Sequence, residues 1–254
     1  SQPNKIKMED QSPIYVFEKM DLLGATSSDS LIIKNTSGKF NPMTNQWSGN
    51  AGNISWRRVG YKEDEVFVDF KKYQIDLSKP QLLLDTVDFT FKPYVKTPIK
   101  GKFEDNLFTS KSIANTYPQF TSFDKVSLKI SDNIHLESGI GLEGNKLFAT
   151  STGRAEPARL TILNGKKVKI IESEANKYSI NNFKQIDALK AKVNFAFLDS
   201  ATSIFHPSST LSYNVETKNL KITRENSNDA KIPFIAPFFK MILYVDQFDW
   251  NIDS

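Results

Sequence analysis

Residues 84–91 have the sequence Leu84-Asp85-Thr86-Val87-Asp88-Phe89-Thr90-Phe91, in which apolar or aromatic residues alternate with charged or polar ones. The same alternation marks residues 65–70 and 72–77 just upstream. Successive side chains of a β-strand point to opposite faces of a sheet, so a period of two is typical of strands that are buried on one side. These stretches therefore predict half-buried strands.

The alternation recurs along most of the chain, at residues 126–130, 134–136, 160–163, 168–171, 193–197, 211–215, 220–223 and 241–245. The strongest turn signal is Asn164-Gly165, because this pair tolerates the positive φ angles of a type I′ hairpin turn. Residues 13–23 and 186–191 have a roughly helical spacing without good caps and suit strands equally well. We predict an all-β fold with little helix, in which short antiparallel strands form a sandwich, a meander or an irregular solenoid-like array.

The chain has 254 residues, of which 39% are hydrophobic and 12% aromatic, so it can build a core without disulfide or metal staples. Residues 1–12 are polar and are expected to form a mobile leader. Residues 13–254 are then expected to form one continuous β body. The alternative is two β units, residues 13–106 and 124–254, joined by the segment 107–123.

Composition excludes several classes of site. Cysteine is absent, which removes thiol nucleophiles, disulfides and cysteine-containing metal sites, and His135 and His206 alone cannot make a three-histidine metal site. The 33 basic and 29 acidic residues leave a net charge of +4 without a dense basic cluster, so we predict no nucleic-acid partner. We also predict no metal and no cofactor.

The most apolar run is residues 233–245. It contains Lys240 and two prolines, and it is shorter than the roughly 18 apolar residues that a membrane-spanning helix needs. We therefore predict no transmembrane segment.

Two local motifs match catalytic patterns in their letters only. Residues 139–144 fit the G-x-G-x-x-G pattern of dinucleotide-binding turns, but a strand-like segment follows instead of a helix, which favours glycines at a strand bend. His206 follows Asp199 and Ser200 closely, yet a catalytic triad depends on spatial arrangement, and the chain has no G-x-S-x-G turn. We interpret His206 as a partly buried side chain that is hydrogen-bonded to the backbone.

Paired carboxylates, which glycoside hydrolases use, are the one catalytic arrangement that composition leaves open. Asp85 and Asp88 are expected on opposite faces of their strand, and the same spacing separates Asp246 from Asp249. We therefore predict no catalytic residue.

Residues 47–56, Trp47-Ser48-Gly49-Asn50-Ala51-Gly52-Asn53-Ile54-Ser55-Trp56, form the stretch best suited to bind a ligand. A Gly/Asn-rich loop between two tryptophans can present flat rings on which sugars stack, while the amides of Asn50 and Asn53 bind hydroxyl groups. The competing and preferred interpretation places both indoles in the core, where aromatic residues usually lie. Trp47, Asn50, Asn53 and Trp56 are the candidate ligand-binding residues.

The latter half of the chain carries a looser signal in residues 199–207, 211–215, 220–224, 233–234 and 241–250, together with 139–148 and 156–158. These segments resemble stretches of long, uncharacterised β-rich envelope proteins of Gram-negative bacteria. The resemblance implies an exported, non-catalytic part of a larger protein. It assigns no functional residue.

The sequence thus favours a non-catalytic extracytoplasmic β module, in the periplasm or at the cell surface, that is a structural or binding segment of a larger cell-envelope protein. The start at Ser1, without a methionine, is expected of a processed or excised chain. Its expected partners are other segments of that protein. Two alternatives remain: a glycan-binding or glycan-cleaving β domain around Trp47 and Trp56, and a lipid-binding β groove lined by the phenylalanines of the alternating strands.

Overall fold

The computed structural model describes residues 2–9, 12–92, 94–107, 116–152, 156–196, 202–224 and 232–252. Strand makes up 70% of the structure and helix 2%, which confirms the all-β prediction. The helical residues include the short 3-10 helix η1 (Trp56–Val59), which ends at Gly60 in the left-handed conformation. Antiparallel β-pairing therefore organises the chain.

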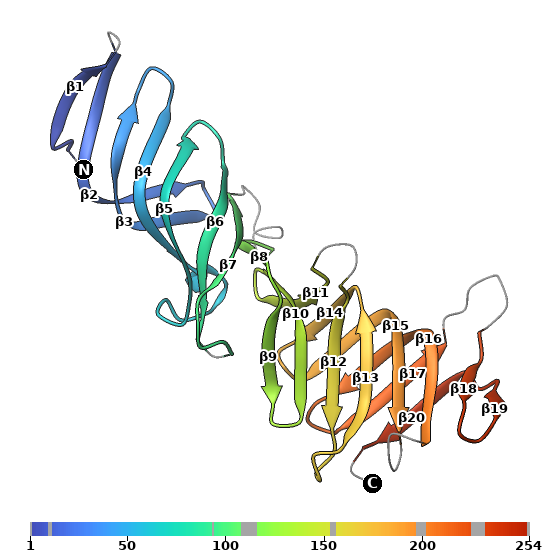
Figure 1. The fold of residues 1–254 in the computed structure, drawn as a ribbon. Coiled ribbons are helices and arrows are strands. Elements are labelled where there is room, and N and C mark those ends of the chain that lie inside the picture. The colour runs from blue at the N-terminus through green and yellow to red at the C-terminus, as the bar shows by residue number, and fades with distance from the viewer. Residues whose placement is uncertain are drawn as a thin grey trace. The chain divides into compact units, whose positions relative to one another are not determined.

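The chain divides into two compact units (Figure 1), Ser1–Phe123 with Leu142–Asn145 and Asp124–Gly141 with Lys146–Ser254. We call them the N-terminal unit and the C-terminal unit. The strands of the N-terminal unit are β1 (Lys5–Glu9), β2 (Ser12–Ala25), β3 (Ser30–Asn41), β4 (Gln46–Ser55), β5 (Val66–Asp76), β6 (Gln81–Phe91), β7 (Ile99–Asn106) and β8 (Gln119–Ser122). The later strands are β9 (Val126–Ser131), β10 (Ile134–Glu143), β11 (Lys146–Thr150), β12 (Ala158–Leu163), β13 (Lys169–Ala175), β14 (Lys177–Asn181), β15 (Gln185–Ala196), β16 (Ser203–Asn214), β17 (Asn219–Arg224), β18 (Phe234–Ala236), β19 (Met241–Leu243) and β20 (Gln247–Asn251).

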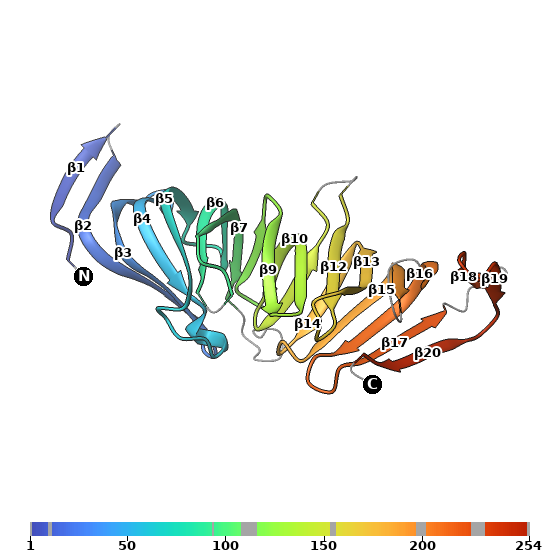
Figure 2. The same cartoon turned by 60° about the horizontal axis from the view of Figure 1, so that its bottom comes forward.

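The N-terminal unit is an antiparallel meander. Each strand from β1 to β7 pairs with the strand that follows it in the sequence, so the succession ends at β8. Figure 2 shows this succession from a second side. Residues 5–9, which were expected in a mobile leader, pair along their whole length with β2 and so belong to the meander.

The C-terminal unit has a more complex strand order. β10 pairs with β12, and β11 pairs with β14, so neighbours in the sheet are not always neighbours in sequence. β15 pairs first with β14 and then with β13 along one edge, while β16 pairs along its other edge. Lys190, between these two pairings, has a φ of 52°, and the register of β15 against β16 shifts between Ala188 and Ala191 and again between Ala191 and Val193. This local irregularity therefore allows β15 to pair with β14 in its first part and with β13 in its second part.

Each unit has a closed aromatic core. In the N-terminal unit, the ring of Trp56 lies 5.2 Å from Phe89 and 5.6 Å from Phe103, and Phe89 stacks on Phe120 at 4.1 Å. In the C-terminal unit, Phe195 and Phe234 meet edge to face. All of these rings are buried, together with Trp47, Phe91 and Tyr178.

A bulge on β6 corrects one prediction from the alternation. Leu84 pairs with Phe103, but Val87 pairs with Gly101, so one strand has an extra residue between these pairs. Asp85 and Asp88 consequently lie on the same, solvent-facing side of β6, and the expectation of opposite faces was wrong. Asp88 lies 3.7 Å from the ammonium group of Lys100.

The hairpin predicted at Asn164-Gly165 is present, but its turn is of another type. Lys167 N donates to Asn164 O at 3.0 Å, and Asn164 N donates to Val168 O at 2.9 Å. The left-handed residue is Lys167, with a φ of 63°, while the Asn164 side chain accepts from the backbone N–H groups of Lys166 and Val168. A three-residue loop with an Asx turn therefore replaces the two-residue type I′ turn.

The boundary between the two units lies close to the segment that the two-unit alternative predicted as a junction. The chain first passes from the N-terminal to the C-terminal unit between Phe123 and Asp124, at the end of the segment 107–123 that the two-unit alternative treated as a junction. Leu142–Asn145 then belongs to the N-terminal unit again. Residues 119–122 of that segment form β8 and pair with β7. Residues 108–115 lie outside the described part.

Candidate functional site

The stretch from Trp47 to Ser55 is strand and not a loop, and Trp56 begins η1. Residues 46–55 form β4, which pairs with β3 on one side and β5 on the other. Trp47 and Trp56 are 1% and 0% exposed, whereas Asn50 is exposed and Asn53 half-buried. The two indoles and the two amides therefore point to opposite sides, and the structure does not bring them together as a sugar-binding platform.

Polar contacts show how the core holds Trp47. Its indole N–H donates to the hydroxyl of Tyr73 at 2.9 Å, and the same hydroxyl lies 2.7 Å from the hydroxyl of Thr36. Burial raises the pKa of Tyr73. This network fixes Trp47 inside the N-terminal unit.

The glycines of β4 also have a packing role. A Cβ atom at Gly49 would lie 2.2 Å from the ring of Tyr73, and one at Gly52 would lie 2.6 Å from the ring of Phe70. Both rings belong to β5 and cross over the backbone of β4, so only glycine fits beneath them. The Gly/Asn composition that suggested a binding loop instead reflects close packing of two strands.

Asn50 does line a hollow of about 720 Å³ on the surface of the N-terminal unit, beside Lys39, Lys72 and Asp85. Neither Trp47 nor Trp56 lines it. The hollow therefore lacks the indole stacking surface that the glycan hypothesis requires.

The phenylalanines of the alternating strands do not line an open groove in the described residues. Phe89, Phe91, Phe103, Phe120 and Phe195 are all fully buried. A lipid-binding groove built from these rings is therefore not supported. Among the described residues, the exposed phenylalanines are Phe123, Phe238 and Phe239, and the last two expose more than half of their side chains.

His206 has the structural role that its sequence position suggested. It is 1% exposed, its Nε2 lies 3.0 Å from Ile232 O, and its Nδ1 accepts from Ser208 N at 3.1 Å. The second contact makes Nδ1 the acceptor, so Nε2 carries the proton and donates to Ile232 O. Both ring nitrogens are thus engaged with backbone groups. Asp199 and Ser200 lie outside the described residues.

The other motif also has a structural role. Residues 139–143 lie within β10, and Gly144 follows in the turn to β11 with a φ of 59°. A strand and the turn that follows it, and not a helix N-terminus, therefore contain this glycine pattern.

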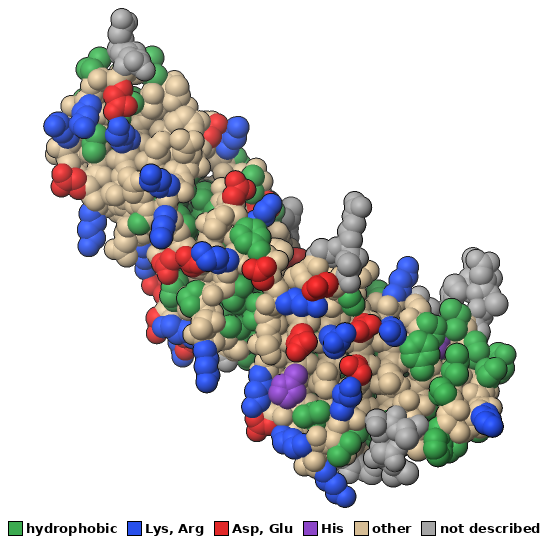
Figure 3. Space-filling view, in the orientation of Figure 1, with side chains coloured by type: hydrophobic (Ala, Val, Ile, Leu, Met, Phe, Trp, Pro, Cys, Tyr) green, Lys and Arg blue, Asp and Glu red, His purple; other side chains and the backbone are tan. Residues whose placement is uncertain are grey.

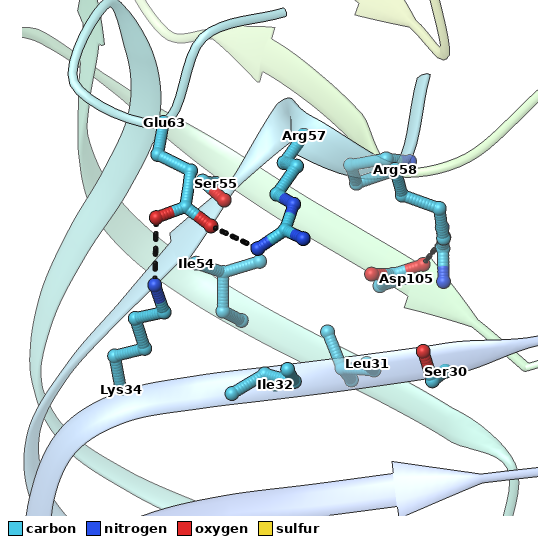
Figure 4. A pocket seen from close by; sticks show the side chains of 11 residues that line it. Ser30, Leu31, Ile32, Lys34, Ile54, Ser55, Arg57, Arg58, Glu63 and Asp105 are labelled. Atoms are coloured by element: carbon cyan, nitrogen blue, oxygen red, sulfur yellow. Dashed lines mark hydrogen bonds and ion pairs between the residues drawn. The ribbon is translucent and has the colours of Figure 1, made fainter. Parts of the chain in front are cut away.

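A charged pocket of about 250 Å³ lies in the N-terminal unit between β3, β4, η1 and β7 (Figure 4). Glu63 stands at one side, where its carboxylate accepts from Lys34 Nζ at 2.7 Å and from Arg57 Nη1 at 3.0 Å. The hydrogen bond from Lys34, joined by that from Arg57, holds the pKa of Glu63 below its ordinary value. Glu63 thus ties β3 to the start of η1.

Arg58 occupies the deeper side of the charged pocket. It forms ion pairs with Asp105 and, at 3.4 Å, with Asp29. Asp105 is 1% exposed, and burial raises its pKa to about 6, against the opposing effects of Arg58 and the backbone N–H of Asn106. Each cation of the pocket is thus matched by a carboxylate of this chain. The arrangement is that of an internal ion-pair network that anchors η1.

The most unusual surface belongs to residues 232–245, which we call the apolar hairpin. β18 and β19 pair through Phe234 with Leu243, Ile235 with Ile242 and Ala236 with Met241. Its exposed large apolar side chains are those of Ile232, Ile235, Phe238, Phe239, Met241, Ile242, Tyr244 and Val245. Figure 3 shows apolar side chains gathered over this hairpin.

Phe234 provides the largest buried contact between the apolar hairpin and its unit, and β18 also pairs with β16. Phe234 is fully buried, and its ring lies 4.7 Å from Phe248 and 4.6 Å from His206. The neighbouring Ile235, which points the other way, is 39% exposed, and Ile242 opposite it is 60% exposed. Both faces of this short ribbon are therefore apolar, although only one faces the core. The sequence had marked this run as the most apolar of the chain.

The described residues contain no cluster of His, Asp and Glu that could hold a metal ion. None of the helices found in this part of the chain has the length and hydropathy to cross a bilayer. No protein-family model, curated protein or solved structure matches the sequence or its fold.

Proposed function

We propose that this chain is a non-catalytic β module that serves as a binding segment of a larger cell-envelope protein and attaches through the apolar hairpin. The observation that carries the proposal is the contiguous exposed apolar surface of residues 232–245. Contiguous apolar surface of this kind on a water-facing protein usually marks an interaction site.

The energetics of the surface support a docking role. Phe238, Phe239 and Ile242 each expose half or more of their side chains. Complete burial of such a side chain is worth about 1.5–3 kcal/mol, so removal of several of them from water drives association. Isolated exposed apolar residues elsewhere, such as Leu189, have no such group around them in the sequence and need no functional explanation.

The chemistry of the charged groups is consistent with a non-catalytic module. The carboxylates of Glu63 and Asp105 are paired with cations, and His206 is engaged with backbone at both ring nitrogens. These groups stabilise the fold in the contacts they make. The extracytoplasmic location, in the periplasm or at the cell surface, rests on the resemblance to envelope proteins.

The proposal is tested with isolated envelopes of the source cells and the purified chain. We expect the wild-type chain to sediment with the envelopes, and the double substitution Phe238→Ser with Phe239→Ser to remain in the supernatant. Leu189→Ser is the matched control, because it removes a 72% exposed apolar side chain from the same unit outside the hairpin.

Location is measured separately on the natural full-length protein, by protease access to spheroplasts. We expect digestion without lysis of the cytoplasmic membrane. Protection until lysis, or equal envelope binding by wild type and the double variant, would contradict the proposal.

A further inference from the structure

The geometry points to a lipid surface with negative charge as the partner of the apolar hairpin. We propose that Phe238 and Phe239 enter the boundary between lipid headgroups and acyl chains while Lys240 stays at headgroup level. This inference rests on the proposed function of the hairpin as an attachment surface, and it names the chemistry of the partner.

The shape of the hairpin favours insertion. β18 and β19 have three residues each, and the turn between them is closed by a hydrogen bond from Lys240 N to Pro237 O at 3.1 Å. Phe238 and Phe239 occupy the turn itself, where they are 62% and 52% exposed and their rings lie 5.1 Å apart. Apolar bulk is thus concentrated at the tip. Aromatic side chains on such a tip can be buried in the boundary region between lipid headgroups and acyl chains, because lipids rearrange around them.

Strand addition by another protein is disfavoured at this place. β19 is only three residues long, and short edge strands give few main-chain hydrogen bonds to an added strand. A stable protein interface also buries about 800 Å² on each partner, usually as a broad patch, whereas this surface is the end of a narrow ribbon.

The charges agree with an anionic lipid surface. Between residues 232 and 245 the only charged side chain is Lys240, which is exposed next to the two phenylalanines. The first acid that follows, Asp246, is paired with Arg224 at 2.7 Å. A lysine beside an apolar tip can extend its ammonium group to the headgroups while its methylene stem stays among apolar neighbours. Anionic headgroups attract such a cation.

The base of the hairpin is already ordered. Phe234 is buried against Phe195, Phe248 and His206, so the apolar tip is held in place before it meets a partner. Insertion then needs little additional ordering of the chain, which favours binding.

The test measures sedimentation of the purified chain with large vesicles of phosphatidylcholine that contain a minority of phosphatidylglycerol. We expect the wild-type chain to bind, Phe238→Ser with Phe239→Ser to bind at least about tenfold more weakly, and Leu189→Ser to bind as wild type does. Lys240→Gln is expected to weaken binding about fivefold on these vesicles and to change little on pure phosphatidylcholine. Circular dichroism checks that each variant keeps its strand content.

Three results would overturn the inference: no vesicle binding by the wild type, equal binding by the double variant, or an equal loss in Leu189→Ser. Sedimentation velocity without lipid tests whether the chain forms a dimer. If the wild type forms a dimer that the double variant does not form, and the wild type does not bind vesicles, then the partner of the hairpin is a second copy of the chain. Binding to cell envelopes without binding to vesicles would reject the lipid partner and leave the proposed attachment function standing. If the native protein is cytoplasmic and the chain still binds vesicles, the proposed function in the cell envelope is rejected and the lipid partner of the hairpin is kept.

Discussion

Two aromatic-rich stretches, residues 47–56 and the apolar hairpin 232–245, occupy opposite kinds of position in this protein. Trp47 and Trp56 are buried, whereas Phe238 and Phe239 are more than half exposed. β4 lies between two long partners, β3 and β5, while β19 pairs with β18. The difference teaches that aromatic content does not set exposure, and that the number and length of the neighbouring strands do.

The two stretches also differ in how polar residues are placed. β4 has a polar side, which carries Ser48 and Asn50, opposite its buried side. In the hairpin, Ile235 and Ile242 face each other on the open side, where a soluble two-stranded ribbon would normally carry polar residues. Apolarity on both faces, more than the presence of phenylalanine, distinguishes the hairpin.

The largest expected difference between the two stretches is in their contribution to stability, and the substitution Trp56→Ala tests it. We expect it to lower the free energy of unfolding of the N-terminal unit by about 3–5 kcal/mol, because it opens a cavity between Phe89 and Phe103. Phe238→Ala should change stability by less than about 0.5 kcal/mol, since its side chain already meets water. Urea unfolding followed by circular dichroism measures both. Similar losses in the two variants would remove the distinction between the stretches.

The next effect concerns pH and the buried carboxyl of Asp105. Burial raises its pKa to about 6 in the folded protein, whereas an unfolded aspartate has a pKa of about 3.9. The folded state therefore holds the proton more tightly, so this contribution to stability is complete below about pH 4 and is lost as the pH rises through about 6, by at most about 3 kcal/mol.

Urea midpoints between about pH 4 and pH 7 test this sign. Asp105→Asn, which cannot titrate, should remove that part of the pH dependence. If the variant shows the same decline as wild type, another group is responsible.

The smallest of the three effects tests why β4 is rich in glycine. Gly49→Ala is expected to cost about 1–3 kcal/mol, because the new Cβ would lie 2.2 Å from the ring of Tyr73. Gly165→Ala is the matched control, since a Cβ there meets no atom within 4 Å. Thermal unfolding of both variants gives the comparison, and equal shifts would argue against ring packing as the reason for Gly49.

Much of the fold could be predicted from the sequence, and the errors were local. Alternation located strands because the pleat places every second side chain on the same face. The alternation failed as a guide at β6. There the extra residue between Leu84 and Val87 shifts the alternation by one position, so Asp88 lies on the same face of the strand as Asp85. At Asn164-Gly165 the hairpin was right and the turn type wrong, because the left-handed residue is Lys167.

The candidate site was less predictable. The preferred core interpretation of Trp47 and Trp56 agrees with their burial, and the binding interpretation does not. Residues 233–245 were recognised as the most apolar run, but a test for a membrane-spanning helix could not reveal a surface hairpin. The charged pocket was missed, because Arg58, Asp29 and Asp105 are far apart in the sequence and meet only through the pairing of separate strands.

By itself, the sequence determined that this chain forms half-buried strands, that it has no cysteine, and that residues 232–245 carry a single charge, because these properties belong to local composition and period. The tertiary structure decided which apolar faces are covered. Exposure depends on strands that are distant in sequence: β5 closes over Gly49 and Gly52 and helps bury β4, while Ile235 and Ile242 on the open side of the hairpin stay exposed to water.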